Sequence, residues 1–153
     1  MRLKAALPVA VVLVVLFAAP SGANALPKAC DLLTAQGAAS LLGGPAGLLM
    51  DGGVVCGYSA KSGGGTATFS LSEGGATDAN LAMMTRDIGG GGYQKETISG
   101  LGDQCVYVVR TGDHLSLTVF YHKNVLVLSV VKKATPEIKA AMIQSMKQML
   151  AKF

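Results

Sequence analysis

The sequence lacks the motifs of several well-defined enzyme and cofactor classes. It contains no G-x-S-x-G, no completed G-x-G-x-x-G, and no Gly-Lys-Ser/Thr after any of its glycine clusters. It also has no C-x-x-C pair, which argues against thioredoxin-like redox chemistry and covalent haem attachment. The 20 glycines are therefore assigned to turns and linkers, and no cofactor is expected.

The first 25 residues, MRLKAALPVAVVLVVLFAAPSGANA, differ in composition from the rest of the chain. A short cationic start is followed by an apolar stretch too short to span a bilayer comfortably, and small residues end it at Ala23 and Ala25. This pattern predicts a signal peptide (1–25) cleaved after Ala25 and a single exported domain (26–153), secreted or periplasmic. No transmembrane segment is expected after cleavage.

Basic residues are scattered along the chain, with no run of lysine or arginine and no basic stripe with interleaved aromatics. Of the 13 basic residues, Arg2 and Lys4 belong to the leader, which leaves 11 against 9 acidic residues. A nearly neutral domain of this kind gives no support to a nucleic-acid partner.

Three cysteines are present in a chain predicted to reach an oxidising compartment, where disulfides persist. One bridge can form and one thiol is left over. Cys30 lies at the start of the first predicted helix and Cys56 at the start of the first predicted strand, and we favour this pairing, with Cys105 free and buried. Spacing leaves the other two pairings open.

Hydrophobic periodicity predicts the element order α-β-β-α-β-β-β-α. Helices are expected over 30–42, 77–88 and 135–153, two strands over 54–60 and 66–72, and three consecutive strands within 100–132, with 45–53 as a loop. This order predicts an α+β domain with one antiparallel sheet of about five strands and helices packed on one face. On the last helix, Met142, Met146 and Met149 share one side, which indicates core filling more than copper(I) binding.

The strongest strand signal defines two predicted hairpins. The first turns at Thr111–His114 with Arg110 opposite Leu115, and the second turns at Lys123-Asn124 with Tyr121 beside Leu126. The core face of these strands is then predicted to hold the apolar side chains Val106, Val108, Leu115, Leu117, Val119, Leu126, Leu128 and Val130.

The same register places three chemically active residues on the opposite face. Asp103 lies across from His122, and Cys105 is a diagonal neighbour of His122, about 7–8 Å away between backbones. In such a group a histidine can take the thiol proton and an aspartate can orient the imidazole, as thiolate catalysis requires. The same residues could bind zinc or copper. Against this, a free cysteine is commonly an inert small hydrophobe, and Asp103 suits the capping position of a turn.

Several short motifs resemble a family of small exported bacterial domains. The motifs are Cys30-Asp31-Leu32-Leu33-Thr34, Leu41-Leu42-Gly43, Cys56-Gly57-Tyr58-Ser59 and Gly100-Leu101-Gly102-Asp103. The family comprises mostly actinobacterial lipoproteins of unknown function, related to extracellular sensor domains of membrane serine/threonine kinases. The resemblance implies a helix-to-strand disulfide and a non-catalytic sensing or binding role. The chain departs from the family in lacking a lipoprotein cysteine and in placing Cys105 after the Gly-Leu-Gly-Asp turn.

These observations predict a non-catalytic exported binding or sensing domain, whose partner is a protein or a cell-envelope component. The alternative is a thiol-dependent enzyme or metal-binding protein that uses Cys105, His122 and Asp103.

Overall fold

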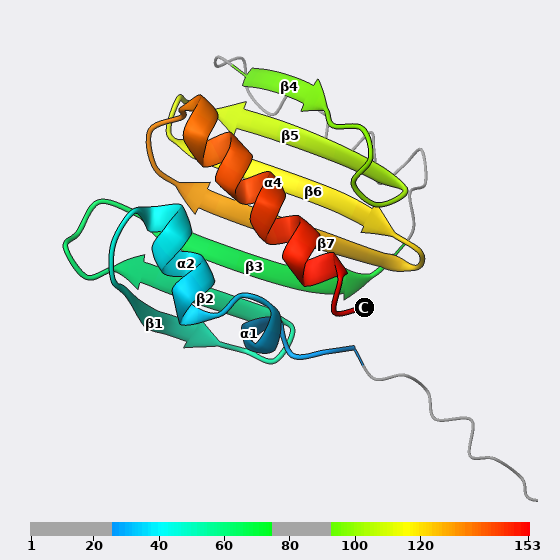
Figure 1. The fold of residues 1–153 in the computed structure, drawn as a ribbon, viewed down its shortest axis with the longest axis horizontal. Helices are drawn as coiled ribbons and strands as arrows, with labels where there is room; N and C mark the ends of the chain where they lie inside the picture. Colours follow the sequence, from blue (N-terminus) through cyan, green and yellow to red (C-terminus); the bar gives the residue numbers. More distant parts are fainter. Residues whose placement is uncertain (1–25, 75–92) are drawn as a thin grey trace, which may run out of the picture.

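The computed structural model describes residues 26–74 and 93–153, which form one antiparallel sheet with helices packed against it (Figure 1). Three described helices lie on the same face of the sheet (Figure 1): α1 (Ala29–Leu32), α2 (Ala35–Leu42) and α4 (Pro136–Leu150). The seven strands are β1 (Ala46–Asp51), β2 (Val55–Ala60), β3 (Thr66–Glu73), β4 (Tyr93–Thr97), β5 (Gln104–Arg110), β6 (His114–Tyr121) and β7 (Asn124–Val131). Across the sheet their order is β1-β2-β3-β7-β6-β5-β4.

The predicted α+β class with one antiparallel sheet is confirmed, but the predicted five strands are too few. The described element order is α-α-β-β-β-β-β-β-β-α. The sequence interpretation missed β1 and β4, which form the two edges of the sheet. The predicted leader (1–25) and the predicted helix over 77–88 lie outside the described residues.

The first predicted helix is divided into two. Leu33 has an extended backbone between α1 and α2, and the Thr34 side chain accepts a hydrogen bond from the Gly37 N–H at 3.2 Å. This is the side-chain N-cap that satisfies an otherwise unpaired donor in the first turn of α2. Gly43 then ends α2 in the left-handed region, with φ 75°. Lys132, which follows β7, donates its ammonium hydrogen bond to the Leu42 carbonyl at 2.7 Å.

The last helix packs a methionine-rich side onto the sheet. Thr135 accepts a hydrogen bond from the Ile138 N–H at 3.3 Å, and Pro136 occupies the first turn, as the sequence indicates. Met142, Met146 and Met149 are all buried in the hydrophobic core. The methionines therefore fill the core, the role that the sequence favoured for them.

The predicted register of the first hairpin is wrong by one residue. Arg110 pairs with His114 and Val109 pairs with Leu115, so the connecting loop has three residues in place of the predicted four. Thr111 (φ 50°) and Gly112 (φ 76°) both adopt positive φ, and the Thr111 hydroxyl donates to the Asp113 carboxylate at 3.2 Å. Because side chains alternate along a strand, this shift of one residue moves every β5 side chain to the other face.

The core face of β5 consequently differs from the prediction. Cys105 and Tyr107 contribute to the core beneath the helices, whereas Val106 and Val108 are buried on the opposite face of the sheet. The other six predicted core residues are confirmed: Leu115, Leu117, Val119, Leu126, Leu128 and Val130.

The second hairpin explains why the predicted core face of β6 and β7 is correct. The turn lies at His122-Lys123, so Tyr121 pairs with Asn124, and the predicted pairing of Tyr121 with Leu126 is wrong. The difference is two residues along the strand. A displacement of two residues preserves the side-chain face, so the predicted core assignments remain correct although the register is not.

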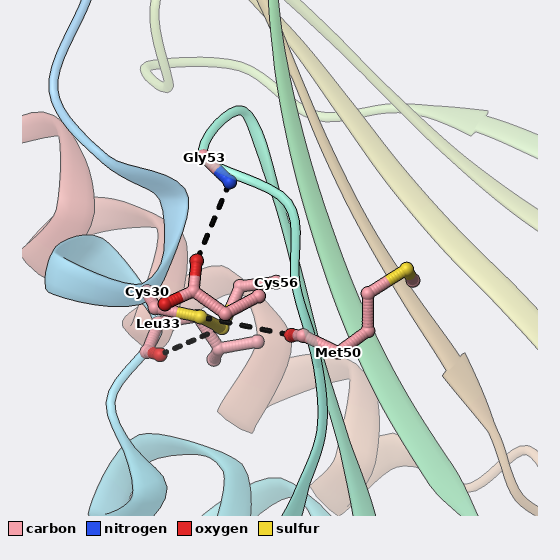
Figure 2. Close-up of a disulfide and its surroundings, with 6 residues drawn as sticks. Cys30, Leu33, Met50, Gly53 and Cys56 are labelled. Atoms are coloured by element: carbon pink, nitrogen blue, oxygen red, sulfur yellow. Dashed lines mark hydrogen bonds between the residues drawn. A yellow bond between two sulfur atoms is a disulfide. The ribbon is translucent and has the colours of Figure 1, made fainter.

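The favoured disulfide is present, joining Cys30 of α1 to Cys56 of β2 (Figure 2). The Cys30 sulfur lies 3.8 Å from the Met50 carbonyl oxygen, and the Cys56 sulfur lies 3.7 Å from the Leu33 carbonyl oxygen. The Ala29 N–H donates a 2.6 Å hydrogen bond to the Gly53 carbonyl, which adds a second connection between α1 and the β1–β2 hairpin. No helix in 26–74 or 93–153 is long and apolar enough to cross a membrane.

Candidate functional site

Cys105 is a buried thiol with no accessible surface. It lies on the helix-covered face of β5, opposite Val119, and not on the face that the predicted register assigned to it beside His122. Burial raises the pKa of the Cys105 thiol to about 12, because a thiolate there would lose its hydration. A nucleophilic cysteine requires the opposite, a lowered pKa and access for its substrate.

Asp103 and His122 do meet, but through the backbone of the histidine. The Asp103 carboxylate accepts a 2.6 Å hydrogen bond from the His122 N–H, and the Asp103 N–H donates to the Phe120 carbonyl at 2.8 Å. His122 has φ 53°, and its imidazole packs beside the Tyr121 ring with centroids 4.2 Å apart. The aspartate thus stabilises a strained turn backbone and does not orient the imidazole.

The structure does not assemble the predicted Cys105–His122–Asp103 group. Cys105 lies inside the core, whereas Asp103 and His122 are exposed at the end of the hairpin. Among the described residues, no group of three or more His, Cys, Asp or Glu side chains is placed to hold a metal ion. The cause is the register of the β5–β6 hairpin, which turns the Cys105 side chain away from the exposed end of β6.

The most unusual surface feature lies at the β1 edge of the sheet. Leu48, Leu49, Met50 and Val54, which we call the β1 patch, expose 61, 62, 45 and 47% of their surface. Within the described part of the chain, these are four of the five exposed large apolar residues. Leu48 pairs with the core residue Tyr58 and Met50 pairs with Gly57, so these two side chains lie on opposite faces of the sheet. Val54 lies in the turn between β1 and β2. Exposed apolar side chains along one strand edge are typical of a segment that a partner covers.

The backbone of β1 is open as well. β1 pairs with β2 on one side and is the last strand of the described sheet on the other. Leu49 has no Cα partner on β2 and forms a β-bulge between Leu48 and Met50. An edge strand carries a row of N–H and C=O groups that can accept a further strand.

The opposite edge of the sheet is protected by charge. β4 has the sequence Tyr-Gln-Lys-Glu-Thr, and Glu96 forms an ion pair with Lys139 of α4. The Lys139 ammonium also lies 5.5 Å from the centre of the Tyr107 ring. Charged residues on an edge strand discourage pairing with another chain, and β1 carries a single one, Asp51 at its last position, whereas β4 carries Lys95 and Glu96. The two edges therefore differ in their capacity to bind.

The sequence interpretation missed this site because it assigned 45–53 to a loop. Pro45 and Gly52-Gly53 flank the segment and are typical of turns, and they obscured the strand between them. Three consecutive apolar residues bounded by turn residues were the available signal for a short strand.

Comparison of the chain with protein-family models, with curated proteins and with solved structures found no match.

Proposed function

We propose that the chain is an exported, non-catalytic binding or sensing domain whose partner is another protein or a component of the cell envelope. The observation that carries this proposal is the β1 patch, four exposed apolar side chains along and beside a strand that forms one edge of the described sheet. These side chains are already about half buried, so covering the rest of each one favours association by about 1 kcal/mol, before the entropic cost of binding is subtracted.

Export is supported by two features of the chain. The leader-like composition of 1–25 is typical of a cleaved signal peptide, and the Cys30–Cys56 disulfide suits an oxidising compartment. The resemblance to small exported bacterial domains supports the same location and the same non-catalytic role.

Site-specific photocross-linking in the producing cells tests the proposal. A photoreactive phenylalanine analogue at position 49 lies in the β1 patch, and the same analogue at the exposed position 97 on β4 is the matched control. We expect position 49 to give a discrete cross-linked species that position 97 does not give. Identical adducts at both positions, or none at either, would contradict the proposal.

Alkylation tests the non-catalytic part of the proposal. We expect iodoacetamide to leave Cys105 unmodified in the native protein at neutral pH and to modify it fully in denaturant, because the native thiol is buried and protonated. Rapid native labelling that is lost in His122→Ala would instead favour thiol chemistry at this cysteine.

A further inference from the structure

We infer that the occupant of the β1 patch is a second copy of this chain, whose β1 strand adds antiparallel to the first and joins two sheets into one. The inference rests on the proposed function, since it names the partner of the surface proposed there. Pairing of this kind would satisfy the outward backbone groups of both strands and bring the apolar side chains of the two β1 strands into contact with each other.

The bulge gives β1 a hydrogen-bonding pattern that is symmetric about its centre. The Lys61 N–H donates to the Pro45 carbonyl at 2.9 Å, and the Gly52 N–H donates to the Val55 carbonyl at 2.8 Å, so positions 45 and 52 face β2. Alternation along an antiparallel strand then turns 47 and 50 toward β2 and 46 and 51 outward. The extra residue Leu49 leaves two adjacent positions, 48 and 49, between the inward pair.

This pattern determines one register for self-pairing. A two-fold axis between positions 48 and 49 sets 48 opposite 49, 47 opposite 50 and 46 opposite 51 of the second copy. Each outward position then meets an outward position, and each inward position meets an inward one. A two-fold axis through a single residue would match the outward positions of the two copies on only one side of the bulge.

The side chains also complement one another in this register. Gly47 would face Met50 of the second copy, and its missing side chain leaves room for the long methionine. In the single chain the Met50 side chain packs over Gly57 of its own β2, with its Cε 3.7 Å from the position of a Gly57 Cβ, so on pairing it would turn toward Gly47 of the second copy. A Cβ on Gly47 would lie 3.8 Å from the Lys61 Cε, so the aliphatic part of this lysine provides a surface for that methionine. Asp51 would face Ala46, so no two like charges are opposed across the axis.

The area available predicts a weak dimer. Within the paired segment, the half-exposed side chains of Leu48, Leu49 and Met50 offer on the order of 100 Å² each, which gives a total interface of roughly 600 Å² from both copies. Interfaces of this size lie below the standard for stable complexes. We expect a dissociation constant of about 10 µM to 1 mM.

Sedimentation velocity of the purified protein between about 10 µM and 1 mM, the concentration range of weak association, tests this inference. The average mass should rise toward that of a dimer with concentration. Leu49→Lys should remain monomeric throughout, because it sets two like charges beside each other at the axis. Thr97→Lys, the same change of charge on the β4 edge, should associate like the parent chain.

Cysteine cross-linking tests the register. In the proposed pair, positions 47 and 50 of different copies are non-hydrogen-bonded partners with Cα atoms about 4.5 Å apart, within the range of a disulfide. Under mild oxidation, a mixture of Gly47→Cys and Met50→Cys should form a mixed disulfide, and neither variant alone should form a disulfide-linked dimer. A mass independent of concentration, or no mixed disulfide, would overturn the inference. If a different protein is then cross-linked at position 49, the proposed function still stands.

Discussion

Loss of the Cys30–Cys56 disulfide should lower the free energy of unfolding by about 3.5 kcal/mol at 25 °C. The bridge closes a loop over a sequence separation of 26, and the chain-entropy model assigns that cost to the freedom gained by the unfolded chain. The perturbation is the double variant Cys30→Ala/Cys56→Ala, compared with the oxidised parent.

The structure indicates that this loss should be global and should not release α1 alone. Leu32 and Leu33 are buried in the core, and the Ala29 N–H remains bonded to the Gly53 carbonyl whether or not the disulfide is present. Helix α1 should therefore stay docked in the variant. The amide of Ala29 should then exchange with solvent through the same global unfolding as the amides of the central strands.

Urea unfolding followed by circular dichroism measures this effect. With a slope of about 2 kcal/mol per molar urea, the midpoint should fall by about 2 M. Reducing agent should have the same effect on the parent and none on the double variant. A midpoint shift below about 0.5 M, or fast exchange confined to Ala29 and its neighbours, would contradict a global loss of stability.

Three further predictions concern the turn before β5, the buried thiol and the end of α2. Gly102→Ala should cost about 2–5 kcal/mol and Gly100→Ala about 1–2 by urea unfolding. Both glycines have positive φ, but only at Gly102 would a Cβ meet the Phe120 oxygen and Val119 Cγ1, each at 2.5 Å; equal costs would contradict this contact. The pKa of Cys105 rises on folding from 9.0 to about 12. The protonated thiol therefore contributes its full share of the free energy of unfolding below pH 9, and this share is lost as pH rises toward 12. The parent should therefore lose about 1.4 kcal/mol more than Cys105→Ala between pH 8 and pH 10, and parallel pH profiles would argue against it. Lys132→Met should cost about 1–2 kcal/mol through the lost hydrogen bond to Leu42, whereas the exposed Lys133→Met should change stability by less than about 0.5.

The sequence was sufficient to predict the elements with strong local signals. The alternation of Ala67, Phe69 and Leu71 along β3 and the Thr135-Pro136 start of α4 are both present in the structure. These signals depend on the segment alone, through side-chain periodicity and capping, and so they can be interpreted without the rest of the fold.

The predicted grouping of Cys105, His122 and Asp103 was wrong because it depended on the length of one loop. A loop of three residues, with Thr111 at φ 50°, replaced the expected four, and Cys105 turned into the core as a result. Positive φ at a threonine is uncommon and is not encoded in any local pattern. The hydrogen bonds of the loop to its surroundings, from the Lys132 N–H to the Asp113 carbonyl and from the Ala134 N–H to the Gly112 carbonyl, are long-range contacts.

The β1 edge was missed for a different reason. Five uncharged residues between turn signals fit a loop or a short strand equally well, and pairing with β2 decides between them. Exposure of Leu48 and Leu49 then follows from the position of β1 at the edge, which no periodicity within the segment reveals.

Chemical-shift mapping of the isotope-labelled protein tests the central claim, that β1 is the binding edge and β4 is not. The labelled protein is titrated with unlabelled protein and, separately, with the secreted and envelope fractions of the producing cells. We predict that backbone amide signals of residues 46–54 shift or broaden in at least one titration, and that those of 93–97 remain unchanged. Changes centred on β4, or no change at β1 in either titration, would show that β1 is not the binding edge.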